Sequence, residues 1–259
     1  MPSIAEWMGK AEAESGIEVM PAFVRWQHEA EKHDRAGDYG WMAEQLAPCR
    51  VLEIGCGVGF GTRALQARGF EVLALEPVRD CIAIASSRCS EDLARTQSGV
   101  AAKFLQGSVE QSRVEIDRAG ATCEGIRADI ERFAPEWVIC WLMGADDQAL
   151  DRQLPPAQAV QKYREAVHRQ VAELAASLSS VQGVHLVDRT AFPWKIKDTA
   201  RETLLVYHQA TTFSGLPFAL TIKDALYRKL DERQWPAPTV QRQSNGIVPV
   251  LGSLRARRI

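Results

Sequence analysis

The stretch VLEIGCGVGFG, residues 51–61, decides the fold of this chain. Its first four residues are mostly apolar and predict a buried strand, and residues 61–68 predict a helix after it. Between the two, glycine stands at every second position, 55, 57, 59 and 61. Glycine lets the backbone approach a ligand closely, and open α/β sheets bind ligands at the carboxyl ends of their strands. We therefore expect a ligand site at this turn.

Apolar runs alternate with helical stretches downstream of the turn. Strands are predicted at 71–75, 102–106, 137–142 and 184–188, and helices at 79–95, 123–133 and 157–178. Parallel strands need crossover connections, and a sheet with helices on both faces buries its strands completely. The pattern predicts an α/β fold with a mostly parallel, doubly wound sheet.

The two ends of the chain follow other patterns. Helices are predicted at 3–13, 21–32 and 39–46, so residues 1–48 are expected to form a helical cap on a main domain of residues 49–259. Beyond Pro193 we expect a strand at 203–208, a helix at 220–232 and a strand at 246–255. The last two strands are expected to pair at one edge of the sheet, where Pro249 is tolerable, and residues 200–259 to add substrate-side elements.

Composition limits the class of protein. The chain has 259 residues, 46% of them hydrophobic, and a formal net charge of −2. Such a balance suits one globular domain and argues against general nucleic-acid binding, which needs a basic surface. The arginines at 255, 257 and 258 are expected to form a solvated tail. Six scattered cysteines without a CxxC pair indicate a reduced, cytoplasmic protein with no metal site, and no apolar run is long enough for a membrane span.

Two acidic residues narrow the choice of ligand at the glycine turn. A dinucleotide-binding loop reads GxGxxG, whereas the glycines here alternate strictly. Glu53 precedes them by two residues, where it would repel a pyrophosphate but favour a ligand that carries an ammonium and a sulfonium. Glu76, at the end of the next strand, can accept hydrogen bonds from a ribose. A phosphate-binding loop is excluded because no Gly-Lys-Ser/Thr follows.

Residues 50–193 resemble the class I, Rossmann-like methyltransferases that use S-adenosylmethionine (SAM) and release S-adenosylhomocysteine. The resemblance implies a doubly wound, mostly parallel seven-stranded sheet. It also implies a set of cofactor-binding residues, with the glycine loop around the methionine half, an acidic ribose ligand, neighbours of the adenine, and the end of the fourth strand where cofactor and substrate meet. These are Glu53, Gly55, Cys56, Gly57 and Gly59; Glu76 and Pro77; Ser108 and Val109; and Trp141, Leu142 and Met143.

The chain departs from the family pattern in three places. The usual Asp beside the adenine amine is absent, so Ser108 takes that place, with Glu110 as the alternative. The connection at 109–133 is longer than usual and predicts an insertion. The fourth strand ends in CWLMGADD instead of the Asn/Asp-Pro-Pro-aromatic tetrad that is typical of amino-group methylation.

Methyl transfer from a sulfonium is a direct displacement that requires alignment of the nucleophile and, for some acceptors, a base. Asp146, just past the fourth strand, and His208, at the end of the predicted strand 203–208, are the candidate bases; helix capping is the competing interpretation of Asp146. Other histidines are expected at the surface (His28, His33, His168) or in the core (His185).

Aromatic residues are the candidates for substrate contacts. Tyr39 or Trp41 is expected to close over the sulfonium by a cation–π contact, and Met143 and Trp194 to line the substrate side, while plain helix packing is the competing interpretation. Trp26 is expected in the core.

The leading hypothesis is therefore methyl transfer to a small molecule, with no membrane or nucleic acid as partner. The alternatives are a methyltransferase acting on a protein or tRNA and a SAM-binding module without catalysis, since cofactor binding and catalysis use different residues. A NAD-dependent oxidoreductase is disfavoured by the glycine spacing and Glu53. The sequence specifies no oligomeric state.

Overall fold

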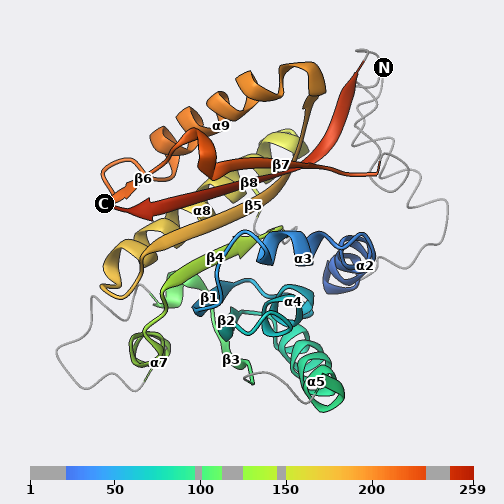
Figure 1. Ribbon diagram of the computed structural model, residues 1–259, viewed down its shortest axis with the longest axis vertical. Coiled ribbons are helices and arrows are strands. Elements are labelled where there is room, and N and C mark those ends of the chain that lie inside the picture. Colours follow the sequence, from blue (N-terminus) through green and yellow to red (C-terminus); the bar gives the residue numbers. More distant parts are fainter. Residues whose placement is uncertain (1–21, 97–100, 113–124, 145–149, 232–245) are drawn as a thin grey trace.

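The computed structural model describes residues 22–96, 101–112, 125–144, 150–231 and 246–259 (Figure 1). The predicted helix at 3–13 and the candidate base Asp146 lie outside these residues, and the predicted insertion at 109–133 is described only in part.

One sheet organises the described residues, with the strand order β3-β2-β1-β4-β5-β8-β6 and β7 paired to β8. The five parallel strands are β1 (Arg50–Ile54), β2 (Glu71–Glu76), β3 (Lys103–Gln106), β4 (Trp137–Trp141) and β5 (Gly183–Pro193). The antiparallel strands are β6 (Phe218–Ala219), β7 (Ala225–Lys229) and β8 (Ile247–Arg258). The mostly parallel α/β fold class is confirmed, with eight strands in the described residues where seven were expected.

Helices cover both faces of this sheet, because neighbouring strand residues point to opposite faces. Val51 and Val72 belong to a core shared with α3 (Asp38–Ala43), α4 (Phe60–Gln66) and α5 (Arg79–Thr96), against which α2 (Ala22–Arg35) also packs. Leu52 and Leu73 belong to a second core, shared with α7 (Ile126–Phe133), α8 (Pro156–Ser177) and α9 (Lys197–Thr211). The sheet is therefore doubly wound, as the sequence predicted.

The strand order reverses at β1, which has β2 on one side and β4 on the other. The chain leaves β1 toward β2 and β3 and then returns to β4 and β5 on the far side. Crossovers that lead away in opposite directions leave a crevice at the carboxyl ends of the two central strands. The glycine turn after β1 lies at this crevice.

Two predictions beyond Pro193 are wrong. Residues 203–208 are part of helix α9, not a strand: Leu204 and Leu205 pack against the core, whereas the side chain of Val206 is 70% exposed. Residues 220–232 form no α-helix in their described part, since a 3-10 turn at Ile222–Asp224 leads into strand β7. Short apolar runs fit a strand and one face of a helix equally well, so only packing decides between them.

The C-terminal strand is also not where the sequence placed it. β8 lies inside the sheet, between β5 on one side and β6 and β7 on the other, and not at an edge. At Pro249 the pairing with β7 comes to its end, since Val250 is the last paired residue and the Pro249 carbonyl still accepts a hydrogen bond from Leu230 N. The hydrogen bond that proline cannot donate is therefore lost at the end of this ladder and not in its middle.

The C-terminal arginines are part of the fold, so the expectation of a solvated tail is wrong. The Nη2 atom of Arg258 donates to the carbonyls of Ala175, Ala176 and Leu178 at 2.8–3.2 Å, where α8 ends. Arg255 donates to the carbonyl of Gln45 at 2.8 Å. A guanidinium is well suited to the unpaired carbonyls of a helix end.

Two further observations concern the whole of the described chain. None of its helices combines the length and the apolar character needed to cross a membrane. The cysteines at 49, 56, 81, 89 and 140 are all free thiols.

Candidate functional site

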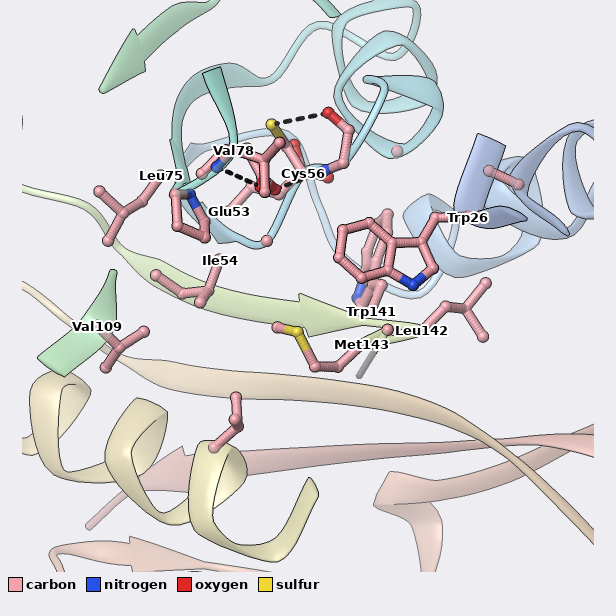
Figure 2. A pocket seen from close by; sticks show the side chains of 18 of the residues that line it. Trp26, Glu53, Ile54, Cys56, Leu75, Val78, Val109, Trp141, Leu142 and Met143 are labelled. Atoms are coloured by element: carbon pink, nitrogen blue, oxygen red, sulfur yellow. Dashed lines mark hydrogen bonds between the residues drawn. The ribbon is translucent and has the colours of Figure 1, made fainter. Parts of the chain in front are cut away.

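A cavity of about 480 Å³ lies at the carboxyl ends of β1, β2 and β4. The glycine loop forms its floor, and the ends of β2, β3 and β4, helix α2 and one face of α8 form its walls. Figure 2 shows side chains from these elements converging on it. Such concave, largely apolar sites with a few polar groups are typical of small-molecule binding.

The glycine loop needs glycine at two positions for different reasons. Gly57 has a φ of 52°, a backbone conformation that residues with a side chain rarely adopt. In this conformation the N–H of Gly57 donates a hydrogen bond to Oε2 of Glu76 at 2.9 Å. At Gly61 a Cβ atom would stand 2.5 Å from Oε1 of Glu53. The loop thus packs directly on both acidic residues that the sequence analysis singled out.

Glu53 is buried at the end of β1, with only 3% of its surface exposed. The hydroxyl of Thr62 donates to its Oε2 at 2.5 Å. Burial raises the pKa of Glu53 to about 7, with a further increase from the charge of Glu76 and a partly offsetting decrease from the Thr62 hydrogen bond. Glu53 therefore titrates near neutrality, and a bound cation would favour its charged form.

Glu76 ends β2 and is also buried. Its Oε2 accepts from Gly57 N and its Oε1 from Val78 N at 3.0 Å. Burial raises the pKa of this carboxyl, while the two backbone hydrogen bonds act in the opposite direction. Each carboxylate oxygen can accept more than one hydrogen bond, so both retain capacity for ligand hydroxyls.

The turn after β3 forms the third wall. Gly107, Ser108, Val109 and Glu110 line the cavity there. Ser108 also begins a short helical turn, since its N–H donates to the side chain of Gln111 at 2.8 Å and its hydroxyl accepts from Gln111 N at 3.2 Å. Val109 is buried in the core beneath. The predicted residues are therefore at the cavity, with the Ser108 hydroxyl already used as a helix cap.

The end of β4 forms another wall of the cavity, with Trp141, Leu142 and Met143. The indole N–H of Trp141 donates to Nδ1 of His185 at 3.2 Å, and His185 Nε2 meets the Ser253 hydroxyl at 2.8 Å. Leu142 has a φ of 53°, which turns the chain sharply after the strand. The methyl group of Met143 lies 2.7 Å from the place a Cβ would take at Gly55. His185 is thus the hydrogen-bonded core histidine that was expected.

The structure separates the predicted substrate residues into two groups. Tyr39 and Met143 line the cavity, and burial, followed by the charge of Glu53, raises the pKa of Tyr39. Trp41 lies outside the lining under the guanidinium of Arg228, 5.8 Å from its ring, and Trp194 stacks on Phe192.

His208, a candidate base from the sequence, does not line the cavity at the glycine loop. It belongs to α9, where its Nδ1 meets the hydroxyl of Thr212 at 2.9 Å, and it lines a different cavity. His33 and His168, expected at the surface, are both buried. His28 is exposed, as expected.

Helix α2 supplies lining residues that sequence reasoning missed, namely Trp26, Glu29, Ala30 and His33. Trp26, expected in the core, packs on Gly144 and points toward the end of β4 (Figure 2). The spacing i, i+3, i+4, i+7 places the four on one helix face. The sequence therefore shows that these four residues share one helix face, but not that this face lines the cavity.

Polar contacts between side chains hold α2 in place. Nδ1 of His33 meets Oδ2 of Asp38 at 2.8 Å, and Asp38 in turn pairs with Nε of Arg228 at 2.8 Å. Glu29 pairs with Arg189, in the middle of β5, at 2.9 Å. The cavity wall on this side therefore depends on contacts between elements far apart in the sequence.

The chain matches no family model and no curated protein. Solved structures with a similar fold include the YcgJ protein of Bacillus subtilis, 16% identical, covering 86% of this chain and 98% of that one, at a TM-score of 0.48. The N-methyltransferase NodS of Bradyrhizobium japonicum, in complex with S-adenosylhomocysteine, is 11% identical (87% and 86% covered, TM-score 0.44). The magnesium protoporphyrin IX methyltransferase of Synechocystis, with bound SAM, is 17% identical (88% and 80%, TM-score 0.42). At such identities and TM-scores the similarity carries no argument about function.

Proposed function

We propose that this chain is a class I SAM-dependent methyltransferase and that SAM binds in the cavity over the glycine loop. The observation that carries the proposal is the pair of buried carboxylates, Glu53 and Glu76, on adjacent strands beneath that loop. Among the described residues, neither carboxylate forms an ion pair with a cationic side chain. Their hydrogen-bond donors are a hydroxyl and two backbone N–H groups. Buried carboxylates without cations are costly, and a cationic ligand with a ribose diol offsets that cost.

The chemistry of these residues fits SAM at both ends. The oxygens of Glu76 suit the two ribose hydroxyls, and Glu53 provides a negative potential for the charged methionine half. Pro77, Ser108 and Val109 are suited to flank the adenine, because they line the neighbouring wall. A dinucleotide fits worse, since its pyrophosphate would lie against the same carboxylates. When bound, SAM supplies an electrophilic methyl group, and the enclosed cavity would serve to align the acceptor with it.

We further propose a small-molecule acceptor, with residues 1–48 acting as a cap on a domain of residues 49–259. Trp26 and Tyr39 from the cap side and Met143 and Val167 opposite line the same cavity. Side chains from four separate segments suit an acceptor that is enclosed rather than one presented by a protein or tRNA surface. Of the basic residues at the C-terminal end, Arg255 and Arg258 are engaged with backbone carbonyls, which does not favour a nucleic-acid surface there.

Removal of a proton from the acceptor, where the chemistry requires it, is proposed for Asp146. It follows Gly144, which lines the cavity, and lies outside the described residues. His208 is not retained for this role because it lines another cavity. A cytoplasmic location is proposed from the free thiols of the described chain, which suit a reducing compartment.

Calorimetric titration with SAM, S-adenosylhomocysteine and NAD tests the cofactor. We expect SAM and S-adenosylhomocysteine to bind and NAD not to, and Glu76→Ala to weaken SAM binding by about 10- to 100-fold through lost hydrogen bonds. Glu71→Ala is the matched control, since Glu71 is exposed at the opposite end of the same strand. Binding of NAD without SAM would refute the proposal.

The acceptor class is tested with methyl-labelled SAM and a cell extract. Label recovered in the small-molecule fraction supports the proposal, while label in protein or RNA supports the second hypothesis. Tight SAM binding without any transfer would indicate a SAM-binding module instead.

A further inference from the structure

A chain of buried hydrogen bonds runs behind the wall of the cavity that Trp141 forms. The indole N–H of Trp141 donates to Nδ1 of His185 at 3.2 Å. Nε2 of His185 meets the hydroxyl of Ser253 at 2.8 Å, and this hydroxyl donates to Oε1 of Gln45 at 2.5 Å. The chain of bonds therefore links the end of β4, through β5 and β8, to Gln45, which follows α3.

The register of the strands places these side chains on one face of the sheet. Trp141 of β4 pairs with Val187 of β5, and Val187 pairs with Ser253 of β8. His185 lies two residues before Val187 and points to the same side, because alternate strand residues share a face. Trp141 and Val187 belong to the core shared with α3, α4 and α5. His185 and Ser253 are completely buried beneath these helices.

Each hydrogen bond of this chain has one possible direction. An indole N–H can only donate, so Nδ1 of His185 carries no proton and Nε2 carries the proton that is donated to Ser253. Burial, followed by the charge of Arg255, lowers the pKa of His185 to about 3. The imidazole is therefore neutral at physiological pH and keeps its acceptor for Trp141. Hydrogen bonds that follow one another in the same direction also polarise and strengthen each other.

The opposite edge of the indole lies beside the glycine loop. A Cβ atom placed on Gly61 would stand 2.5 Å from Oε1 of Glu53, 3.5 Å from Cε3 of Trp141 and 3.6 Å from Cδ1 of Tyr39. A buried carboxylate and two aromatic rings therefore surround one point. Trp141 is one of the residues that line the cavity, and Figure 2 shows it among them. The ring that His185 holds is thus a neighbour of Glu53.

A cation beside Glu53 would gain from a ring that is held in this place. Aromatic rings attract cations, tryptophan most strongly, and the attraction increases where water is excluded. It also depends on how the ring is turned toward the cation. Rotation of the Trp141 indole would break its bond to His185 and leave a buried N–H without a partner, which is unfavourable. The hydrogen bond therefore fixes the orientation of the ring.

We propose that His185 is a positioning residue of the SAM site, which holds the Trp141 indole as the aromatic wall beside the sulfonium of SAM. The inference rests on the proposed function, because the cation in question is the one that SAM brings to Glu53. His185 is not among the residues that line the cavity, so it acts through Trp141.

The test compares two ligands that differ at the sulfur atom. SAM carries a methyl group and a positive charge that S-adenosylhomocysteine lacks, so the ratio of their dissociation constants isolates the contribution of the sulfonium. His185→Phe keeps a ring of similar size without the acceptor for the indole N–H. In calorimetry we expect this variant to bind SAM about 3- to 20-fold more weakly, and S-adenosylhomocysteine within about twofold of the unmodified protein.

Two further comparisons separate positioning from general damage to the core. His208→Phe is the matched control, because His208 is also a buried, neutral histidine that meets a hydroxyl, that of Thr212, but it lines the other cavity. This control should leave the ratio of the two dissociation constants unchanged. In a Trp141→Phe background, adding His185→Phe should change the ratio no further, because no indole remains to be held.

If His185→Phe does not fold, NMR of the unmodified protein decides. The indole N–H signal of Trp141, identified by its absence in Trp141→Phe, should shift more with SAM than with S-adenosylhomocysteine. The inference alone would be overturned by an unchanged ratio in His185→Phe, by an equal change in His208→Phe, by a further change in the Trp141→Phe background, or by an indole signal that responds equally to both ligands. If neither ligand binds the unmodified protein, the proposed function is refuted and the inference with it.

Discussion

Replacing Glu53 by Gln should stabilise the protein at alkaline pH. The side chain is fully buried, and its charged form has a hydroxyl donor but no cation among the described residues. Glutamine keeps the shape and can still accept from Thr62, but it cannot ionise. The variant therefore removes the cost of a buried charge and little else.

The magnitude follows from the pKa of Glu53, about 7 in the folded protein against an ordinary value of 4.5. Between these values the folded state keeps a proton that the unfolded chain has lost, so the free energy of unfolding falls as the pH rises through the window and levels off above about 7. The difference corresponds to about 3 kcal/mol at about 1.36 kcal/mol per pH unit. Most of it falls between about pH 5 and about pH 8.

The assay is urea denaturation of both proteins across this range, without ligand. The variant should gain about 2–3 kcal/mol over the unmodified protein on going from about pH 5 to about pH 8. Glu71→Gln, at the exposed start of β2, is the control and should follow the unmodified profile. Parallel profiles for Glu53→Gln and the unmodified protein would show that Glu53 does not ionise in this window, and the reasoning would be refuted.

Three other perturbations follow from the same contacts. SAM affinity should fall as the pH drops below about 7, where Glu53 becomes protonated, and this pH dependence should vanish in Glu53→Gln. Calorimetry at several pH values measures it. The same pH dependence of affinity in Glu53→Gln as in the unmodified protein would count against a role for Glu53 in SAM binding. Gly61→Ala should cost about 1–3 kcal/mol of stability, because its Cβ would stand 2.5 Å from Glu53 Oε1, and a variant as stable as the unmodified protein in urea denaturation would contradict that close approach. Arg258→Met should cost about 1–3 kcal/mol by leaving the carbonyls at the end of α8 without their donor; thermal denaturation detects the loss, and Arg257→Met, at a more exposed position, should lose less.

The part of the candidate site around the glycine loop was largely predictable because it is local in sequence. β1, the glycine turn and α4 are contiguous, and Glu76 ends the very next strand, so pattern and spacing were enough to bring these residues together. Parallel neighbours in register place Glu53 and Glu76 at the same edge of the sheet.

The wall of the cavity that α2 forms was not predictable in the same way. Trp26 and His33 reach the cavity only because α2 folds back over the end of β4, and nothing local in their sequence specifies that contact. The burial of His33 likewise depends on Asp38 and on Arg228, which is far away in the chain.

The sequence by itself determined the doubly wound sheet and the loop–carboxylate site, because hydrophobic periodicity and glycine spacing act over short stretches of chain. Only the tertiary structure decided that residues 203–208 are helical, that β8 lies inside the sheet, and that His168 and His208 meet beside a second cavity. Those outcomes depend on which faces pack together over long separations, and side-chain burial across elements overrides local preference.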